Sequence, residues 1–288
     1  MFDLLIAPFA EFEFMQRALV GVIAIAVGGG PVGVFLMLRR MSLTGDAMAH
    51  AILPGAAVGY LFAGLSLPAM TIGGLVAGVI VAVMAGLVAR LTSLKEDASL
   101  AAFYLLSLAL GVTIVSLRGS NVDLLHVLFG TVLALDDSAM ILLASIATVT
   151  LLTLAVLYRP LVLECVDPTF LRSVSRAGTP THLIFLGLVV LNLVGGFHAL
   201  GTLLAVGMMM LPAAAARFWS ADITMMTVIA TGIGILSGAV GLLLSFHVEL
   251  PAGPAIILTA GGVYILSLAL GQEGGLVWLV RPGKHLEA

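Results

Sequence analysis

The chain reads RRMSLTGDAMAHAILPG from Arg39 to Gly55, and this stretch decides how the rest of the sequence is interpreted. Two cations precede a long apolar run that contains one acid, Asp46, and one histidine, His50. Residues four positions apart share one face of a helix, so both side chains are predicted to point the same way. Ionisable groups at membrane depth are costly, and such a pair indicates a functional site.

The composition indicates that this chain is a membrane protein. Of 288 residues, 61% are hydrophobic and only 9% are charged, whereas a soluble domain carries about 25% charged residues. Alternating barrel strands would not give such long apolar runs. We therefore predict an all-α, polytopic transmembrane helical bundle in the lipid bilayer, with residues 1–288 forming a single domain.

The same composition excludes several functions. No phosphate-binding Walker motif is present, so the chain is predicted not to be an enzyme that hydrolyses ATP itself. The net charge of -3 argues against a nucleic-acid partner. Cys165 is the only cysteine, which excludes an intramolecular disulfide and a thiolate metal cluster.

Runs of roughly 20 apolar residues mark the spans. A further piece, Val122–Leu135, is too short and is predicted to be an outer helix that does not cross. Gly55-x-x-x-Gly59 and Gly74-x-x-x-Gly78 predict close helix packing in lipid. About eight to nine spanning helices are expected, over Gln16–Leu38, Ala47–Ala63, Met70–Leu91, Ala98–Leu117, Ala139–Tyr158, Leu183–Phe197, Thr202–Ala216, Ile223–Ser245 and Ala255–Leu270.

The basic residues predict the orientation. With the N-terminus outside and nine crossings, ten of the 12 Lys and Arg residues lie inside, and only Arg17 and Arg118 lie outside. Cytoplasmic loops carry such an excess of Lys and Arg. The C-terminal residues 271–288 are then a cytoplasmic tail, and residues 159–180 form a cytoplasmic loop.

Asp46 and His50 are the first candidates for chemistry. A carboxylate and a neutral imidazole together suit zinc, manganese or ferrous iron, but two ligands from one helix leave the shell open. Pro54 cannot donate to the His50 carbonyl and is predicted to kink the helix. The structural alternatives are a buried Asp–His pair, or Asp46 as the N-cap of the second span. At about 1.5 Å per residue, Asp46 lies roughly 10 Å along the axis from the arginine pair, in the cytoplasmic half.

Further polar residues fall on the predicted outer side, where a substrate would enter. Each alone is more commonly an interfacial polar group than a ligand, so they are weaker candidates for a metal pathway. His182 and His285 receive no functional role. The outer candidates are His126, His198, His247 and Glu249.

The predicted inner loop carries a second signal. Asp167 followed by Pro168 indicates a helix start, with the acid as N-cap and the proline at the first helical position. A short amphipathic helix with Phe170, Arg172 and Arg176 would end near Gly178. It either lies on the membrane surface or docks a soluble partner, and a nucleotide-hydrolysing subunit is the natural partner for a chain without a motor.

Several segments together resemble the membrane permease subunit of bacterial zinc/manganese ATP-binding cassette (ABC) importers, the ABC-3 type of metal-ion permease. The resemblance extends from about Ala7 to Leu270. The matching segments, in order, are Arg39–Ser42 with Gly45-Asp46 and Ala49–Ala51, Val122–Gly130, Asp167-Pro168, Leu211–Arg217 and Leu250–Pro254.

This resemblance implies a permease homodimer in the bacterial cytoplasmic membrane, with two ATPase subunits inside and a metal-binding protein outside. It implies that Asp46 and His50 touch the transported ion, Zn²⁺ or Mn²⁺, and that no cofactor is bound permanently. His126 and His247 stand where many relatives carry tyrosine or, for His126, serine, and imidazole suits zinc, so zinc is expected before manganese. The rival functions are a stand-alone ion-coupled metal transporter and an ABC permease for a metal chelate.

Overall fold

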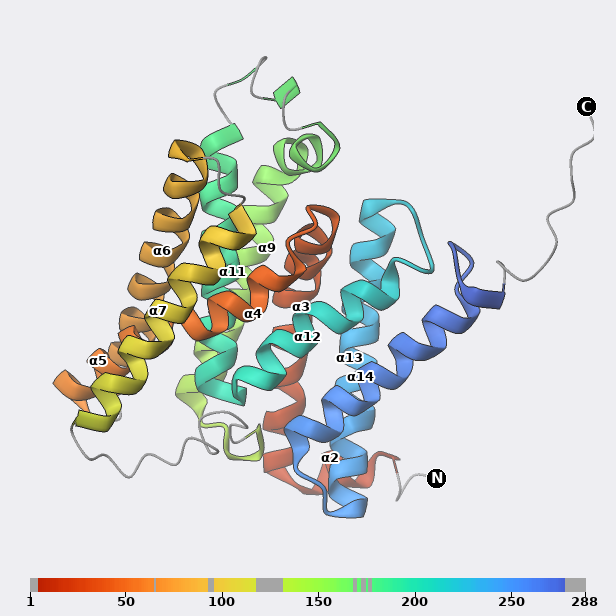
Figure 1. The fold of residues 1–288 in the computed structure, drawn as a ribbon. Helices are drawn as coiled ribbons and strands as arrows, with labels where there is room; N and C mark the ends of the chain where they lie inside the picture. Colours follow the sequence, from red (N-terminus) through yellow and green to blue (C-terminus); the bar gives the residue numbers. More distant parts are fainter. Residues whose placement is uncertain are drawn as a thin grey trace, which may run out of the picture.

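The structure of the protein is a computed structural model that describes residues 5–64, 66–92, 96–117, 132–167, 170–171, 175 and 178–277. Every regular element in these ranges is a helix (Figure 1). The helices are α2 (Ala7–Glu11), α3 (Glu13–Leu38), α4 (Ser42–Ala51), α5 (Leu53–Ala63), α6 (Leu67–Leu91), α7 (Glu96–Leu117), the 3₁₀ turn η1 (Val132–Ala134), α9 (Asp137–Val166), α11 (Gly178–Leu200), α12 (Thr202–Ala216), α13 (Ile223–Val248) and α14 (Ala252–Leu270).

The predicted all-helical, polytopic bundle is confirmed. Among the described residues, six helices are long and apolar enough to cross a membrane: α3, α6, α9, α11, α13 and α14. Shorter apolar helices lie in α7 and α12. The count of eight to nine crossings stays a prediction, because α4, α5 and α12 are each shorter than a full span of about 20 apolar residues. The apolar part of α7, Ala98–Ile114, is also shorter than such a span.

Helix α9 is longer than the sequence predicted. It continues through Arg159 and Pro160 to Val166, so the first part of the predicted loop 159–180 is helical. Leu161 and Glu164 are buried within this extension. The packing of these buried side chains offsets the free energy that is lost when Pro160 removes a backbone hydrogen bond from the helix.

The predicted second span is two helices. α4 ends at Ala51 and α5 begins at Leu53, with Pro54 in the first turn of α5. The break follows from Pro54, which has no amide to bond to the carbonyl four residues earlier. The Ala51 carbonyl at the break accepts a hydrogen bond from the Ser107 hydroxyl of α7, at 2.9 Å. A side chain of another helix therefore satisfies a backbone carbonyl at the break, as an interrupted helix within a membrane requires.

Two of the long helices lie inside the bundle and the others around it. In α3 and α11, 72% and 67% of the most apolar stretch is buried, against 28% in α6, α9 and α14. The short helix α12 packs against α3, α13 and α14 in the middle of the molecule (Figure 1). The peripheral helices carry the exposed apolar side chains, as expected where lipid replaces water.

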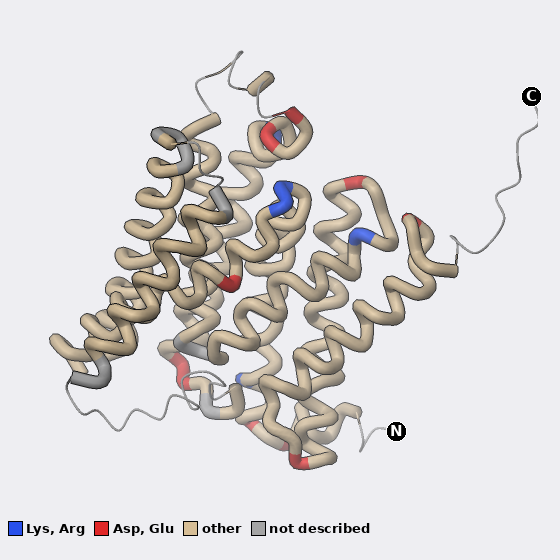
Figure 2. The backbone as a smooth tube through the Cα atoms, in the orientation of Figure 1, with Lys and Arg blue, Asp and Glu red and all other residues tan. Residues whose placement is uncertain are grey.

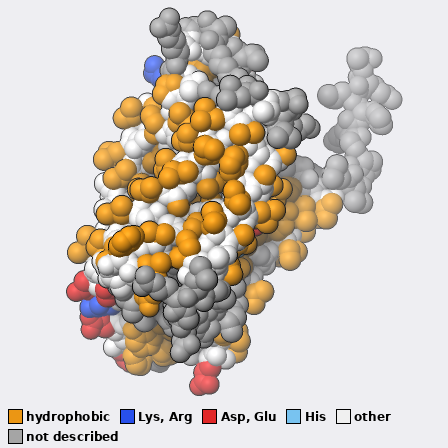
Figure 3. All heavy atoms as spheres, turned by 60° about the vertical axis from the view of Figure 1, so that its left-hand side comes forward, with side chains coloured by type: hydrophobic (Ala, Val, Ile, Leu, Met, Phe, Trp, Pro, Cys, Tyr) orange, Lys and Arg blue, Asp and Glu red, His pale blue; other side chains and the backbone are white. Residues whose placement is uncertain are grey.

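One outer face shows this clearly. Figure 3 shows a broad apolar surface over the side formed by α5, α6 and α7, with charged side chains confined to its two ends. Ile72, Ile80 and Leu106 are each more than half exposed on these helices. Such a continuous apolar belt fits contact with lipid or with another membrane protein.

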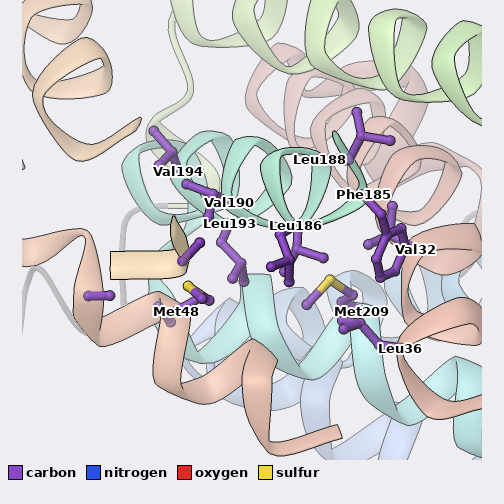
Figure 4. Packing of buried hydrophobic residues seen from close by; sticks show 14 of the residues in the cluster. Val32, Leu36, Met48, Phe185, Leu186, Leu188, Val190, Leu193, Val194 and Met209 are labelled. Atoms are coloured by element: carbon purple, nitrogen blue, oxygen red, sulfur yellow. The ribbon is translucent and has the colours of Figure 1, made fainter. Parts of the chain in front are cut away.

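The main buried cluster fixes the position of α4. Met48 of α4 is fully buried and packs among side chains from α3, α11 and α12 (Figure 4). The α4 helix is thereby held against the centre of the bundle while its opposite face stays open. The surrounding residues include Val32, Leu36, Phe185, Leu186, Leu193 and Met209.

Candidate functional site

Helix α4 holds Asp46 and His50 side by side. Their side chains project from the same face, with 3.9 Å between Asp46 Oδ1 and His50 Nε2. The Asp46 side chain is 66% exposed and that of His50 is 30% exposed. The helix starts at Ser42 with Met41 as its N-cap, so Asp46 lies in the second turn. The alternative that Asp46 caps the second span is therefore wrong, and so is burial of the acid within this single chain.

A pocket opens beside Asp46, between α4 and α7. Its volume is about 160 Å³, and Tyr104 of α7 lines it. The Tyr104 ring also lies 6.2 Å from the His50 ring, between centroids. Thr44 lines the pocket too, and its buried hydroxyl finds no hydrogen-bond partner among the described residues. The remaining lining residues are Leu43, Ala47, Leu100 and Ala101.

The pair can hold one metal ion. Two bonds of about 2.0–2.2 Å, from a carboxylate oxygen and an imidazole nitrogen, place the donor atoms about 3.4 Å apart at a tetrahedral angle. The 3.9 Å between Asp46 and His50 is therefore within a small side-chain rotation of a shared ion. Among the described residues, no group of three His, Cys, Asp or Glu side chains could bind a metal. The site within one chain is therefore a half-shell of two protein ligands, which other donors must complete.

The two outer candidates whose side chains are described, His247 and Glu249, do not join this pair. His247 is exposed in the last turn of α13, and its ring packs edge-on against Phe246 at 5.4 Å between centroids. Glu249 is exposed and ends α13 in a left-handed conformation, with φ of 56°. The His198 backbone belongs to α11, but its side chain lies outside the described residues, as does the whole of His126.

The predicted N-cap in the inner loop is confirmed. The Asp167 carboxylate accepts a hydrogen bond from the Phe170 amide at 2.9 Å, and the Asp167 carbonyl accepts the Leu171 amide at 3.2 Å. Both are the bonds that an N-cap residue accepts, and the described residues Phe170 and Leu171 are helical. The other residues predicted for this segment, Pro168, Arg172 and Arg176, lie outside the described residues.

Sequence reasoning missed a buried polar cluster at the same end of the bundle. Arg39, Glu164 and His182 meet there, with side-chain exposures of 8, 7 and 10%. Arg39 Nη2 donates to Glu164 Oε1 at 2.7 Å and lies 2.6 Å from His182 Nδ1. The guanidinium also sits over the Phe185 ring, 5.0 Å from its centroid. The one available signal was an acid, Glu164, within an apolar run, but assignment of this run to a loop concealed it.

The chain is similar to known membrane transport proteins over most of its length. The model of the ABC 3 transport family matches residues 11–271. The chain is 32% identical over 275 residues to a manganese import system permease protein, ScaB, of Streptococcus parasanguinis, covering 96% of this chain and 95% of that protein. It is 30% identical over 268 residues to a chelated iron transport system membrane protein, YfeD, of Yersinia pestis, covering 93% and 89%.

A solved structure has the same fold. The PsaBC complex from Streptococcus pneumoniae, determined with a Fab, matches with a TM-score of 0.85 at 28% identity and covers 97% of this chain and 99% of the other. The family match and the relatives extend over nearly the whole chain, including the helices that carry the Asp46–His50 pair and the buried cluster. The chain therefore belongs to the ABC 3 transport family, and the resemblance carried by its sequence motifs is confirmed.

Proposed function

We propose that this chain is the membrane permease subunit of an ABC importer that takes up a divalent transition-metal ion. The observation that carries the proposal is the Asp46–His50 pair on the half-helix α4, with the two side chains 3.9 Å apart and Asp46 lining a pocket. Transporter sites are commonly built on interrupted helices at membrane depth. A site with only two ligands from one chain suits transport, because an ion must be bound weakly enough to leave.

Manganese is the proposed ion, ahead of zinc. The relatives are named as manganese permeases and, in one case, as a chelated iron permease, and none of the reported names supports placing zinc first. Oxygen donors suit manganese, and the exposed Asp46 carboxylate that lines the pocket is such a donor. His126, His198, His247 and Glu249 remain proposed contacts along the pathway nearer the outside.

The proposed assembly contains two permeases, ATPase subunits in the cytoplasm and an extracytoplasmic metal-binding protein. The exposed side chain of Asp46 supports a homodimer, because a second copy can cover the open side of the half-shell. The helix start at Asp167 supports docking of the ATPase at the loop that follows α9. In this arrangement the ATPase supplies the energy of hydrolysis and this chain moves the ion.

The proposed orientation has the N-terminus outside and the C-terminus inside, in the bacterial cytoplasmic membrane. Figure 2 shows the Lys and Arg positions near the two ends of the bundle, most of them at the end where α3, α9 and α12 finish. This end holds Arg39, Arg40, Arg159 and Arg217, and Arg17 lies near the other end. The asymmetry supports a cytoplasmic position for the end with the buried cluster.

Metal uptake by an Asp46→Ala/His50→Ala double variant tests this function. We expect uptake of radioactive manganese in a metal-starved host that lacks its own importer to fall at least about tenfold, since tenfold corresponds to only about 1.4 kcal/mol of binding. Glu273→Ala, at an exposed acid beyond α14, is the control. The amount of each permease in the membrane is measured in parallel. Normal uptake by the double variant would refute the metal site.

The energy source separates the proposal from a stand-alone ion-coupled transporter. We expect depletion of cellular ATP to abolish manganese uptake, whereas an uncoupler applied with ATP held constant leaves uptake in place. Uptake that follows the uncoupler instead contradicts the ABC mechanism. Competition by zinc and ferrous iron in the same assay ranks the three metals.

A further inference from the structure

The buried cluster connects three parts of the chain that the proposed mechanism keeps separate. Glu164 lies three residues before Asp167, where the predicted ATPase-docking segment begins. His182 lies near the start of α11, on the far side of that segment. Arg39 follows α3 and stands three residues before Ser42, where the site helix α4 begins. The cluster therefore ties both ends of the loop to the start of the helix that carries the metal pair.

The turn between Arg39 and α4 is held by backbone bonds. The Arg40 amide donates to the Met37 carbonyl at 3.0 Å, and the Met41 amide donates to the Leu36 carbonyl at 2.9 Å. Together with the left-handed conformation of Arg40, at φ of 59°, these bonds form a Schellman turn. Met41, the N-cap of α4, is buried. The connection between Arg39 and α4 is short and held by hydrogen bonds, so a displacement of the Arg39 backbone moves the helix as well.

The protonation state of the cluster follows from its contacts. A guanidinium only donates hydrogen bonds, so His182 Nδ1 at 2.6 Å from Arg39 Nη2 must accept. His182 is thereby fixed as the neutral tautomer with its proton on Nε2. The cluster holds one positive and one negative charge and is neutral as a whole, which allows it to be buried.

Stability alone does not explain this cluster. Among the described residues, nothing bonds to Arg39 Nη1 or to Glu164 Oε2, although both atoms are buried. Buried polar atoms without partners destabilise a fold. Apolar side chains of similar volume often stabilise a protein more than a buried ion pair does. Because two of its buried atoms lack partners, the cluster adds little stability to the fold. A role in passing movement from one helix to another accounts for it better.

We propose that Arg39, Glu164 and His182 are positioning residues that transmit movement of the ATPase-docking loop to Asp46 and His50. The inference rests on the proposed function, because it assumes an ATPase at that loop. Glu164 and His182 flank the loop, so a shift of the loop displaces both residues in the same direction. Arg39 follows through its two contacts, and the Schellman turn passes the shift to α4, which tilts the metal pair relative to α7.

The coupling between ATP hydrolysis and uptake tests this assignment in the reconstituted transporter, with the permease, its ATPase and its binding protein. We expect Glu164→Gln and Arg39→Lys to lower the metal transported per ATP about 5- to 30-fold, within the range found for residues that carry coupling between two sites. ATPase turnover and manganese affinity at Asp46–His50 are expected to stay within about twofold. Arg217→Lys, at an exposed arginine outside the cluster and the turn, is the matched control.

A second readout follows α4 directly. Leu43 on α4 is 75% exposed, so a Leu43→Cys variant on a Cys165→Ala background can be alkylated with N-ethylmaleimide. We expect ATP with vanadate to change its alkylation rate in the otherwise wild-type transporter, and Glu164→Gln to abolish that change. A merely structural role for Glu164 would not affect the ATP dependence of labelling at Leu43.

Unchanged coupling in both Glu164→Gln and Arg39→Lys would overturn the proposal, and so would an unchanged alkylation response. If either variant fails to fold, the charge-swapped pair Arg39→Glu/Glu164→Arg and the apolar pair Arg39→Met/Glu164→Leu replace it. Both folded pairs are expected to bind manganese, and only the swapped pair is expected to regain coupling. Failure of the proposed function is distinguishable, because the unmodified transporter would then show no ATP-dependent uptake at all.

Discussion

Asp136 caps α9, the helix that leads to Asp167 and the proposed docking loop. Its carboxylate accepts the Ala139 amide at 2.9 Å and also a hydrogen bond from the Ser138 hydroxyl. These two bonds, that of Ser138 first, lower the pKa of the Asp136 carboxyl below its ordinary value. The ionised form therefore stabilises the start of α9.

We expect Asp136→Ala to lower the free energy of unfolding by about 1 kcal/mol, as removal of an N-cap does. This corresponds to a fall in Tm of about 2 °C for a protein of this size. Differential scanning fluorimetry of the purified permease in detergent measures the change. Asp136→Asn is the matched control, because an asparagine oxygen can still cap the helix but does not titrate.

The pH dependence of this contribution has a defined sign. The pKa of Asp136 is lower in the folded state than in the unfolded state, where it is roughly 4. The stabilising charge is therefore fully present above the unfolded value and is lost as the pH falls through the folded value. The difference in Tm between the wild type and Asp136→Asn is expected to shrink once the pH falls below about 4 and to vanish only below the folded-state pKa. A difference that grows on acidification would contradict the cap.

Single residues also show how far sequence reasoning extends to the site. The shared face of Asp46 and His50 follows from a spacing of four on one helix, and the structure confirms that the two meet. The partners of Arg39 lie 125 and 143 residues away in the chain. No periodicity links positions on different helices, so only the packing of α3, α9 and α11 reveals this second set of polar residues.

Among the helices, α5 and α6 show the closest approach that the sequence predicted. A Cβ atom added to Gly55 would lie 2.0 Å from the carbonyl oxygen of Gly73, and one added to Gly73 would lie 2.1 Å from that of Gly55. Neither oxygen can move without its helix. The Gly55-x-x-x-Gly59 spacing thus indicates a real contact surface with α6, as expected for helices that associate in lipid. The Gly74-x-x-x-Gly78 spacing faces Ile52 and α11 instead.

We expect Gly73→Ala to destabilise the permease by about 1–3 kcal/mol, because the added methyl group forces α5 and α6 apart. Gly86→Ala in the same helix is the matched control, since nothing lies within 4 Å of its added Cβ. That change is expected to be neutral or to stabilise by up to about 1 kcal/mol, through better helix propensity. Thermal unfolding of both variants in one detergent gives the comparison. Equal losses of stability in the two variants would show that helix propensity, and not the contact between α5 and α6, determines the effect.

The positions of most helices could be predicted, and two boundaries could not. Thr202–Ala216 is predicted and observed with the same limits. Pro54 signalled a kink, but the sequence does not show that α4 ends at Ala51, because the Ser107 hydroxyl that bonds to the Ala51 carbonyl belongs to another helix. Pro160 was read as the start of a loop, but burial of Leu161 and Glu164 keeps α9 helical beyond it.

At the scale of the whole molecule, composition and charge carry most of the information. The surplus of apolar residues appears as the exposed belt in Figure 3, and the few cations gather near the helix ends in Figure 2. What composition cannot supply is the number of crossings. The segment that decides it, Val122–Leu135, ends in the 3₁₀ turn Val132–Ala134, and its first ten residues lie outside the described part of the chain.

Helix α13 offers a direct test of the proposed orientation. It runs from Ile223 to Val248, long enough at about 1.5 Å per residue to cross the bilayer, so its two flanking turns must lie on opposite sides. Ala221 precedes it and Leu250 follows it, and both are exposed. Cys165 is the only native thiol, so a Cys165→Ala background carries a single cysteine when either position is substituted.

We expect a membrane-impermeant maleimide to label Leu250→Cys in intact spheroplasts, and Ala221→Cys only after permeabilisation. The physical reason is the excess of cations at the end where α12 finishes, which is retained in the cytoplasm during insertion. The reverse pattern would place the docking loop outside, where no ATPase could reach it, and would refute the proposed function along with the orientation. Labelling of both positions from one side would show that α13 does not cross, and an even number of crossings would then place Asp167 and Glu249 on the same side of the membrane.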